Sequence, residues 1–330
     1  MKILVAYPTR PSFVARDIEI LKREHFVIEH SYYSPMSIGR GIRAVADCEM
    51  VFLWFASQRA LPLVLAARMM GKPVVTVVGG YEAANCPEIE YGNARSERQK
   101  RFTRMILNRS QAIVAVSHSS KDSIVKNLGI DAARVSVIYH GFEDTAKLLS
   151  ASERSTVLTV GRLEKESWLV KGLREFFLVA RELPRFNFVL IGNVADYNRE
   201  DAIASGVPNL SLIGEVPFTE LGTHYARAKV YLQASRHESF GCSVAEAMLH
   251  GCIPVVRNVY ALPEVVGDCG VIFKGDKVEA IVAAVRMAMS MDSSEGEKAR
   301  QHVLLEFSYQ RRQTALLRII DTVGKTLSQK

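Results

Sequence analysis

Short apolar runs alternate along this chain with longer amphipathic stretches. The runs are apolar nearly throughout, which is typical of parallel strands covered on both faces. The stretches between them repeat apolar residues at helical spacing, as in Gln58–Met70, Ser119–Leu128, Leu173–Glu182 and Val278–Met291. This alternation predicts a doubly wound α/β architecture, formed twice. The expected strands are Ile3–Tyr7, Met50–Phe55, Val74–Val78, Ala112–Val116, Val135–Tyr139, Thr156–Val160, Phe186–Ile191, Leu210–Ile213, Val230–Gln233, Ile253–Arg257 and Gly270–Phe273.

The alternation is interrupted near Phe142–Ser155, where a polar stretch separates the fifth expected strand from the sixth. A chain of 330 residues is also longer than one hydrophobic core usually serves. We therefore expect a first domain over residues 1–150 and a second over 151–306. The final stretch, 307–330, is expected to be helical, and its own pattern assigns it to neither domain.

Composition narrows the class of protein. Apolar residues make up 48% of the chain, yet no uninterrupted apolar segment approaches the ~20 residues of a membrane-spanning helix. The apolar start of the chain is too short for a signal peptide and fits a first strand. The odd number of cysteines and their lack of metal-ligand spacing favour reduced thiols in the cytoplasm. These five cysteines are Cys48, Cys86, Cys242, Cys252 and Cys269.

Net charge indicates an anionic partner. The chain carries a formal charge of +7, which fits nucleic acid, anionic lipid or a phosphorylated small molecule. The stretch Arg95–Arg109 is expected to form a basic amphipathic helix, and such a helix can lie on an anionic membrane surface. The alternative is a solvated helix that packs its apolar stripe inward. The stretch holds Arg95, Arg98, Lys100, Arg101, Arg104 and Arg109 against Glu97, with Phe102, Met105 and Ile106 at helical spacing.

Two basic residues flank one strand-end loop, the kind of loop where open α/β sheets bind ligands. Arg162 follows the strand Thr156–Val160 after one glycine, and Lys171-Gly172 precedes the helix that starts near Leu173. Such a pair can hold a diphosphate, the arginine through its planar fork and the lysine as a point charge. A solvated loop is the alternative, because acidic residues lie between the two.

Glu238 and Glu246 lie eight positions apart in the stretch ESFGCSVAE. A helix is expected over Cys242–His250, with Gly251 as its stop. Gly241 would let a ligand approach the backbone, and the free N–H groups at the helix start favour an anion such as phosphate. Glu246 has apolar neighbours, so if buried it needs a partner such as ribose hydroxyls. The alternative makes Glu238 a favourable charge at a helix start and Glu246 a surface residue.

Several other functions lack their motifs. The sequence contains no GxGxxG fingerprint at the start of either domain, no GxxxxGK[ST] loop and no GxSxG elbow, so dehydrogenase and NTPase functions lose their main support. Nucleic-acid binding would explain the charge but none of the motif spacing. His118 lies at a strand end just before a helix, where Ser119 or Ser120 as helix N-cap explains the serines without any function.

Together these motifs resemble the retaining glycosyltransferases of the GT-B fold, family 4 (glycosyl transferases group 1). The resemblance runs over most of the chain and implies two facing Rossmann-like domains with an inter-domain cleft. It also implies that the helix over 307–330 packs back on the first domain. The matching residues are Val160-Gly161-Arg162-Leu163, Lys171-Gly172, Phe188–Gly192, Glu238-Ser239-Phe240-Gly241, Glu246-Ala247-Met248, Gly251–Val255 and Leu262–Val266, with Ala115-Val116-Ser117 and Val137–Gly141 in the first domain.

The resemblance implies roles for the matched positions. Arg162 and Lys171 would bind the donor diphosphate and stabilise the charge of the leaving group, and Glu238 would contact the donor sugar; these three are the implied catalytic residues. Glu246 would bind the ribose. Many members need no metal, and no DxD-type motif is present, so we expect neither metal nor cofactor. The implied donor-binding residues are Gly161, Arg162, Lys171, Gly192, Gly214, Val216, Glu238, Ser239, Phe240, Gly241, Cys242 and Glu246.

Two loops of the first domain depart from the family pattern. The loop after the first strand reads Pro8–Phe13 in place of the usual Gly-Gly pair, and Arg10 would substitute for that pair electrostatically. The stretch Gly79–Glu82 stands where many members carry a histidine-containing acceptor loop. The expected acceptor side is Arg10, Gly79, Gly80, Tyr81 and His118.

We therefore expect a cytoplasmic hexosyltransferase that moves a sugar, with retention, from a nucleoside diphosphate sugar to a hydroxyl acceptor. The acceptor is a glycan, a lipid or a small molecule, and no nucleic-acid partner is expected. Contact through Arg95–Arg109 would place the enzyme at the inner face of the membrane. The altered loop Pro8–Phe13 motivates an alternative, a non-catalytic protein of the same fold that binds a sugar nucleotide as a regulator or partner subunit.

Overall fold

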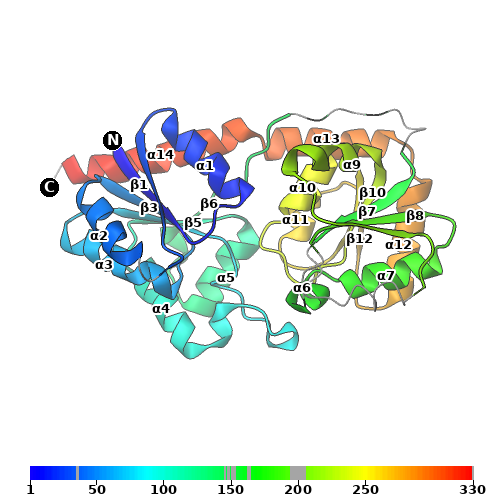
Figure 1. Cartoon of the computed structure of the whole chain (residues 1–330), viewed down its shortest axis with the longest axis horizontal. Coiled ribbons are helices and arrows are strands. Elements are labelled where there is room, and N and C mark those ends of the chain that lie inside the picture. Colours follow the sequence, from blue (N-terminus) through cyan, green and yellow to red (C-terminus); the bar gives the residue numbers. More distant parts are fainter. Residues whose placement is uncertain are drawn as a thin grey trace. The chain divides into compact units, whose positions relative to one another are not determined.

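The computed structural model describes residues 1–34, 37–144, 146, 149, 154–161, 165–193 and 206–328. The chain forms two compact units, shown in Figure 1. Unit 1 combines Met1–Gly141 with Tyr309–Lys330, and unit 2 is Phe142–Ser308. The division falls earlier than the expected one after residue 150, because Phe142 N donates a hydrogen bond to Phe307 O (2.8 Å) and so ties the start of unit 2 to its end.

Unit 1 is built on a parallel sheet of six strands in the order β2-β1-β3-β4-β5-β6. The chain moves from β1 outward to β2 and then returns to pair β3 on the other side of β1. Apolar residues are buried along the central strands, as a sheet covered on both faces requires. The strands are β1 (Lys2–Tyr7), β2 (Phe26–Ser31), β3 (Met50–Trp54), β4 (Val74–Val78), β5 (Ala112–Ala115) and β6 (Val135–Val137).

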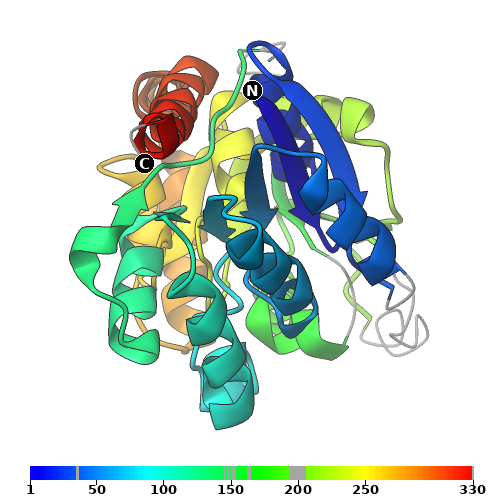
Figure 2. The same cartoon turned by 90° about the vertical axis from the view of Figure 1, so that its left-hand side faces the viewer.

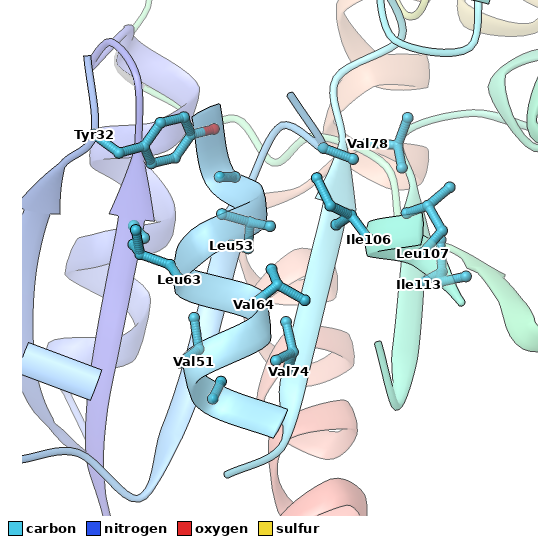
Figure 3. Close-up of a cluster of buried hydrophobic side chains, with 14 of the residues drawn as sticks. Tyr32, Val51, Leu53, Leu63, Val64, Val74, Val78, Ile106, Leu107 and Ile113 are labelled. Atoms are coloured by element: carbon cyan, nitrogen blue, oxygen red, sulfur yellow. The ribbon is translucent and has the colours of Figure 1, made fainter. Parts of the chain in front are cut away.

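Helices cover both faces of this sheet. Figures 1 and 2 show α14, in red, near α1 and away from the cyan α4. The core under α3 and α4 joins Val51 and Leu53 of the sheet to Leu63, Val64 and Ile106 of the helices (Figure 3). The helices are α1 (Ser12–Lys22), α2 (Ile38–Ala46), α3 (Leu61–Met69), α4 (Glu97–Leu107), α5 (His118–Leu128) and α14 (Tyr309–Ser328), with 3₁₀ turns at Gln58–Ala60, Pro87–Ile89, Asn93–Arg95 and Ala132–Arg134.

The C-terminal helix α14 is fastened to unit 1 by a buried ion pair. Arg312 donates to both carboxylate oxygens of Asp17 on α1, at 2.6 and 2.7 Å. It also donates to the carbonyl oxygens of Ile138 and Tyr139, and Trp54 Nε1 donates to Asp17. Each of the two buried charges therefore has an oppositely charged partner and further hydrogen bonds.

Unit 2 repeats the plan with a second six-stranded parallel sheet, in the order β12-β11-β10-β7-β8-β9. Figure 1 shows α7 and α12 on one face of the sheet and α9, α10 and α13 on the other. The strands are β7 (Thr156–Val160), β8 (Asn187–Ile191), β9 (Leu210–Ile213), β10 (Ala228–Gln233), β11 (Ile253–Arg257) and β12 (Val271–Phe273). The helices are α6 (Lys165–Val170), α7 (Leu173–Glu182), α9 (Phe218–Arg227), α10 (Cys242–Leu249), α11 (Leu262–Val266), α12 (Val278–Ser290) and α13 (Ser294–Glu306).

Every expected strand is present, but the sequence pattern misses two elements of unit 1. β2 is an edge strand whose residues are only partly covered, so it lacks the apolar run of the central strands. The stretch Pro8–Phe13 is not entirely a loop, because α1 already begins at Ser12. Pro11 supplies the extended residue before that helix. Within the described ranges, no helix is long and apolar enough to span a membrane.

Candidate active site

The strand order of unit 2 reverses between β7 and β10. The chain runs from β7 through β8 to β9, and then returns to pair β10 on the other side of β7. At such a switch point the loops after the two strands diverge and leave a crevice at the carboxyl edge of the sheet. Lys171 comes from the segment after β7 and Glu238 from the loop after β10, so both candidates belong to this edge.

Lys171 and Glu238 form an ion pair, with Nζ of the lysine 2.6 Å from Oε1 of the glutamate. The glutamate is only 8% exposed, whereas a third of the lysine side chain reaches solvent. The pair therefore anchors one ammonium group at the crevice and leaves part of it accessible. An ammonium group held in this way can meet a phosphate as a point charge.

A glycine explains why the two loops approach so closely. Gly172 has φ +65°, and a Cβ atom at this position would lie 2.2 Å from the carbonyl oxygen of Ala234. Next to this contact, Arg236 N donates to Val170 O (2.8 Å). Since only glycine fits the contact and favours the left-handed conformation, the Lys171-Gly172 pair brings the lysine to Glu238.

A buried polar cluster supports the β10 loop from behind. Arg257 donates to Ala234 O (3.1 Å) and pairs with Asp276, and Arg236 pairs with the buried Glu175 (3.0 Å). These contacts fix the backbone on both sides of Ser235. The loop that carries Glu238 is thus held at several points.

Glu238 has three donors on one carboxylate oxygen. Lys171 Nζ, Gln233 Nε2 and Ser235 Oγ all reach Oε1, at 2.6, 3.2 and 3.0 Å. Gln233 was not among the site residues predicted from the sequence. The period of the strand could have indicated it, because Tyr231, Gln233 and Ser235 alternate along β10 and its continuation and so point to one side.

The helix α10 begins at the same edge. Gly241 is its N-cap residue, with φ +101°, and Cys242 is the first helical residue, so both lie where the sequence predicted. The Phe240 ring is buried against Phe142 and Phe307, with centroids 6.1 and 5.3 Å away. A ligand would therefore meet this segment through its backbone and through the half-buried Ser239.

Glu246 lies further along α10 and is half-buried, which neither of the two sequence-based expectations described. It is not the fully buried carboxylate of one expectation nor the surface residue of the other. Its position on the helix that starts at the crevice leaves the carboxylate within the same unit and sheet edge as Glu238.

Three of the expected donor-binding glycines also follow strand ends. Gly161 follows β7, Gly192 follows β8 and Gly214 follows β9, and these strands are neighbours in the sheet. Gly214 is exposed with open space beside it, and Val216 is half-buried. Arg162 lies outside the described residues, so its predicted position beside Lys171 stays a prediction.

The candidates of unit 1 follow the ends of β1, β4 and β5 and so belong to the carboxyl edge of the other sheet. Arg10 forms an ion pair with Glu29 (3.0 Å), a partner that the sequence analysis did not foresee. His118 is exposed at the start of α5, its ring 6.1 Å from that of Tyr139. The N-cap of α5 is Ser117, whose hydroxyl accepts from Ser120 N, and neither Ser119 nor Ser120 has that role.

The loop after β4 is organised by Glu82, which the sequence analysis did not assign to a role. Its buried carboxylate accepts hydrogen bonds from the backbone N–H groups of Ala56, Gly79 and Gly80, at 3.1, 3.3 and 2.9 Å. Burial raises the pKa of this carboxyl, although these N–H groups act in the opposite direction. The loop therefore holds Tyr81 exposed at the carboxyl edge on a fixed backbone.

No group of three or more His, Cys, Asp or Glu side chains within the described ranges is arranged to hold a metal ion. Among the described residues at this edge of unit 2, Lys171 and Glu238 form an ion pair and neutralise each other. The arrangement therefore offers hydrogen bonds and one accessible ammonium group to a polar, anionic ligand.

Comparison with known proteins defines the class. The model for glycosyl transferases group 1 matches residues 142–303, and the model for glycosyltransferase family 4 matches residues 4–145. The chain is 23% identical, over 81% of its length and 80% of the relative, to the lipopolysaccharide core biosynthesis mannosyltransferase LpcC of Rhizobium leguminosarum bv. viciae. It is 25% identical, over 74% of its length and 65% of the relative, to the GDP-mannose:cellobiosyl-diphosphopolyprenol alpha-mannosyltransferase of Xanthomonas campestris.

The fold agrees with these relatives. The structure of Anabaena Alr3699/HepE in complex with UDP and glucose superposes with a TM-score of 0.79 at 15% identity, over 98% of this chain and 100% of that one. The chain is a glycosyltransferase of the GT-B fold and of the family 4 type. It is a hexosyltransferase, and the comparisons favour the enzyme over the non-catalytic alternative.

Proposed function

We propose that this enzyme transfers mannose from GDP-mannose to a hydroxyl group of a lipid-linked glycan, with retention of anomeric configuration. The Lys171–Glu238 pair at the switch point of unit 2 carries the proposal, because it offers a cation to a diphosphate and a carboxylate to sugar hydroxyls in one place. The names of the mannosyltransferase relatives support the sugar, and the Xanthomonas relative supports the guanine base and the lipid-linked acceptor.

The chemistry follows from charge. As the bond between the sugar C1 and the β-phosphate oxygen breaks, negative charge grows on the departing GDP. Lys171 can stabilise that charge through the N–H groups that Glu238 does not use, together with the N-terminal end of α10. Arg162 is proposed as a second cation there. The acceptor oxygen forms its bond to C1 on the face that GDP leaves, and its proton passes to the departing phosphate.

We propose that no metal ion is needed for this step. The cations that a diphosphate requires are supplied here by protein side chains, Lys171 and the proposed Arg162. Transfer in the presence of excess EDTA should equal transfer without it. A requirement for Mg²⁺ or Mn²⁺ would contradict this part of the proposal.

A membrane contact is proposed for unit 1, through a basic surface formed by Arg95, Arg98, Lys100, Arg101, Arg104 and Arg109. Six cations against the single acid Glu97 give this stretch a net charge of +5. The apolar residues of α4 do not all pack inward, since Phe102 and Met105 are half-buried and line a hollow together with Arg98 and Arg101. Such a surface suits an anionic membrane that presents a lipid-linked acceptor.

The neighbouring helix α3 contributes exposed apolar side chains. α3 packs against α4 and exposes Leu65 and Met69, the latter at 87%. Exposed apolar side chains beside clustered cations are what an amphipathic membrane contact requires. None of the five cysteines forms a disulfide bond, which fits a reducing compartment, so we propose that the enzyme acts at the cytoplasmic face of the membrane.

The donor proposal is tested by thermal unfolding with GDP, GDP-mannose, UDP and UDP-glucose. A ligand that binds the folded state raises the unfolding temperature by mass action, and GDP-mannose should give the largest rise. Lys171→Ala should lose that rise, whereas Lys298→Ala, which removes an exposed lysine paired with Glu295, should keep it. A response to UDP-glucose alone would overturn the guanine assignment, and no response to any of the four would overturn the donor site.

Retention is tested separately from binding. The anomeric configuration of the product, read by NMR, should be α, because GDP-mannose carries its mannose in α linkage. A β product would contradict the proposed stereochemistry and leave the donor assignment intact.

A further inference from the structure

The end of β10 carries a buried chain of hydrogen bonds that leads to Glu238. We propose that Gln233 is a positioning residue that holds one carboxylate oxygen of Glu238 and thereby directs the other to a hydroxyl of the donor sugar. The proposal rests on the proposed donor site and adds to it a residue that does not itself touch the donor.

At one end of this chain of hydrogen bonds, a backbone group occupies the hydroxyl oxygen of Tyr231. Val160 N–H can only donate, and it donates to the hydroxyl oxygen of Tyr231 (3.3 Å). The Tyr231 hydroxyl in turn donates to Oε1 of Gln233 (3.0 Å), and burial raises the pKa of that hydroxyl so that its proton stays in place. Ser243 Oγ donates to the same amide oxygen (3.4 Å). The oxygen of the Gln233 amide therefore faces Tyr231.

Glu238, at the other end of the chain of hydrogen bonds, fixes the orientation of the Gln233 amide. The Glu238 carboxylate can only accept, so the amide nitrogen of Gln233 must face it, at 3.2 Å from Oε1. The second amide hydrogen points to Ser235 Oγ (2.5 Å), and that hydroxyl donates onward to the same Oε1 (3.0 Å). Both ends require the same amide orientation, so every donor and acceptor of Gln233 is used.

These hydrogen bonds make the two carboxylate oxygens of Glu238 different. Its Oε1 accepts from Lys171, Gln233 and Ser235, whereas its Oε2 accepts from no residue in the described ranges. One oxygen is thus filled by protein donors, and the other is left for a donor outside the protein. A sugar hydroxyl is such a donor. A fixed acceptor strongly favours a ligand that carries this hydroxyl over one that lacks it.

This chain of hydrogen bonds also connects β7 with β10, the two strands between which the strand order reverses. Val160 is the last residue of β7 and directly precedes Gly161, while Gln233 is the last residue of β10. A ligand that displaces the loop after β7 would therefore disturb the orientation of Glu238 through three hydrogen bonds.

Gln233→Met tests the positioning role, because methionine keeps the length of the side chain and removes the amide. Calorimetric titration would compare GDP with GDP-mannose, and UDP with UDP-glucose as a second pair. Wild type should bind the sugar nucleotide more tightly than the bare nucleotide. Gln233→Met should lose about tenfold of that preference and bind the bare nucleotide as wild type does. Tyr231→Phe, which removes the donor that orients the amide, should cause a smaller loss and serves if Gln233→Met does not fold.

Gln233→Glu supplies a second, pH-dependent test, read at a temperature at which the melting curve of the variant shows that it is fully folded across the pH range. Its carboxylate lies beside Glu238, so the two like charges share a proton at lower pH. The protonated form can donate to Glu238 as the amide does. Transfer by Gln233→Glu should therefore rise relative to wild type as the pH falls from 8 to 6, whereas Gln111→Glu, in which the oxygen that accepts from Val74 N is kept, should follow the wild-type profile.

The outcomes separate the two proposals. If wild type binds none of the four nucleotides, the donor site itself is wrong. If wild type prefers a sugar nucleotide, and both Gln233→Met and Tyr231→Phe keep the full preference, the donor site stands and the role of Gln233 is wrong. If the ratio of transfer by Gln233→Glu to transfer by wild type does not change between pH 8 and pH 6, the positioning role is likewise contradicted.

Discussion

Arg312 and Asp17 form a two-pronged ion pair inside unit 1, although 295 positions of sequence separate them. Both side chains are almost completely buried, and the Arg312 guanidinium also lies 5.8 Å from the centre of the Trp54 ring. The pair holds the last helix of the chain against the first. It is therefore the clearest point at which the stability of unit 1 depends on the C-terminus.

Removing one member of this pair should be costly. Asp17→Ala leaves a buried guanidinium without its carboxylate, and we expect a loss of about 3–5 kcal/mol in the free energy of unfolding. The double change Asp17→Leu with Arg312→Met removes both charges and should lose less than Asp17→Ala. Urea unfolding of the two variants measures this, and equal losses in both would show that the charge pairing is unimportant.

Gly172 should tolerate no side chain. Gly172→Ala places a methyl group against Ala234 O, in addition to the cost of about 1–2 kcal/mol for the left-handed backbone. Gly129→Ala is a matched control, because Gly129 has nearly the same φ (+64°) and nothing within 4 Å of the new carbon. We expect Gly172→Ala to lose transfer activity and GDP-mannose binding, and Gly129→Ala to keep both. Equal activity in the two variants would contradict the role given to the close loop contact.

The basic surface of α4 should govern binding to anionic vesicles. Replacing Arg98, Arg101 and Arg104 by glutamine removes three charges, each worth about 1 kcal/mol near an anionic surface, and should shift the protein to the supernatant in co-sedimentation with phosphatidylglycerol vesicles. A control variant removes the same charge from exposed positions of unit 2 and should sediment like wild type. Its replaced residues are Arg174, Arg185 and Arg286. Equal sedimentation of both variants would point to net charge and away from this surface.

Stability should fall as the pH drops through the range in which free histidine gains a proton. Burial lowers the pKa of His140 far below its usual value, and the positive charges of Arg312 and Arg16 lower it further. The unfolded chain therefore binds a proton near pH 6.5 that the folded chain refuses, so the folded state loses up to about 1.4 kcal/mol per pH unit for this group. Unfolding temperatures measured from pH 7.5 to 5.5 should fall, and less steeply in His140→Phe than in wild type.

The matched control for that series is His118→Phe, since His118 is exposed on the same unit. Burial also lowers the pKa of His25, His30, His224 and His250, so a residual slope is expected in His140→Phe. If the unfolding temperature of His140→Phe falls with pH as steeply as that of wild type, His140 does not cause the loss of stability.

The sheets could be predicted because their central strands are buried on both faces. A run such as Val74–Val78 has no polar face to confuse the pattern. β2 was missed for the opposite reason: at the sheet edge its residues need not be apolar. The polar stretch Phe142–Ser155 indicated the break between the units, and unit 2 begins at its first residue. The exact boundary could not be predicted, because the contact between Phe142 and Phe307 joins positions that are far apart in sequence.

The charged residues of the candidate site were visible in the sequence, but their supporting residues were not. Lys171 could be selected because a glycine follows it, and the structure shows that this glycine permits the contact with Ala234. Gln233 resembled an ordinary polar residue at a strand end. Its importance depends on Tyr231, on Ser243 from α10 and on the distance to Glu238, and none of these relations is contained in local spacing.

The position of α14 has a consequence for biosynthesis. Unit 2 is a continuous stretch of chain, whereas unit 1 is completed only by Tyr309–Lys330. Since a ribosome releases the chain from its N-terminus, the strands of unit 1 emerge first but wait for Arg312 to neutralise the buried Asp17. All residues of the second unit therefore leave the ribosome before the segment that completes the first unit has been made. A chain interrupted before Tyr309 would carry a complete unit 2 joined to an incomplete unit 1.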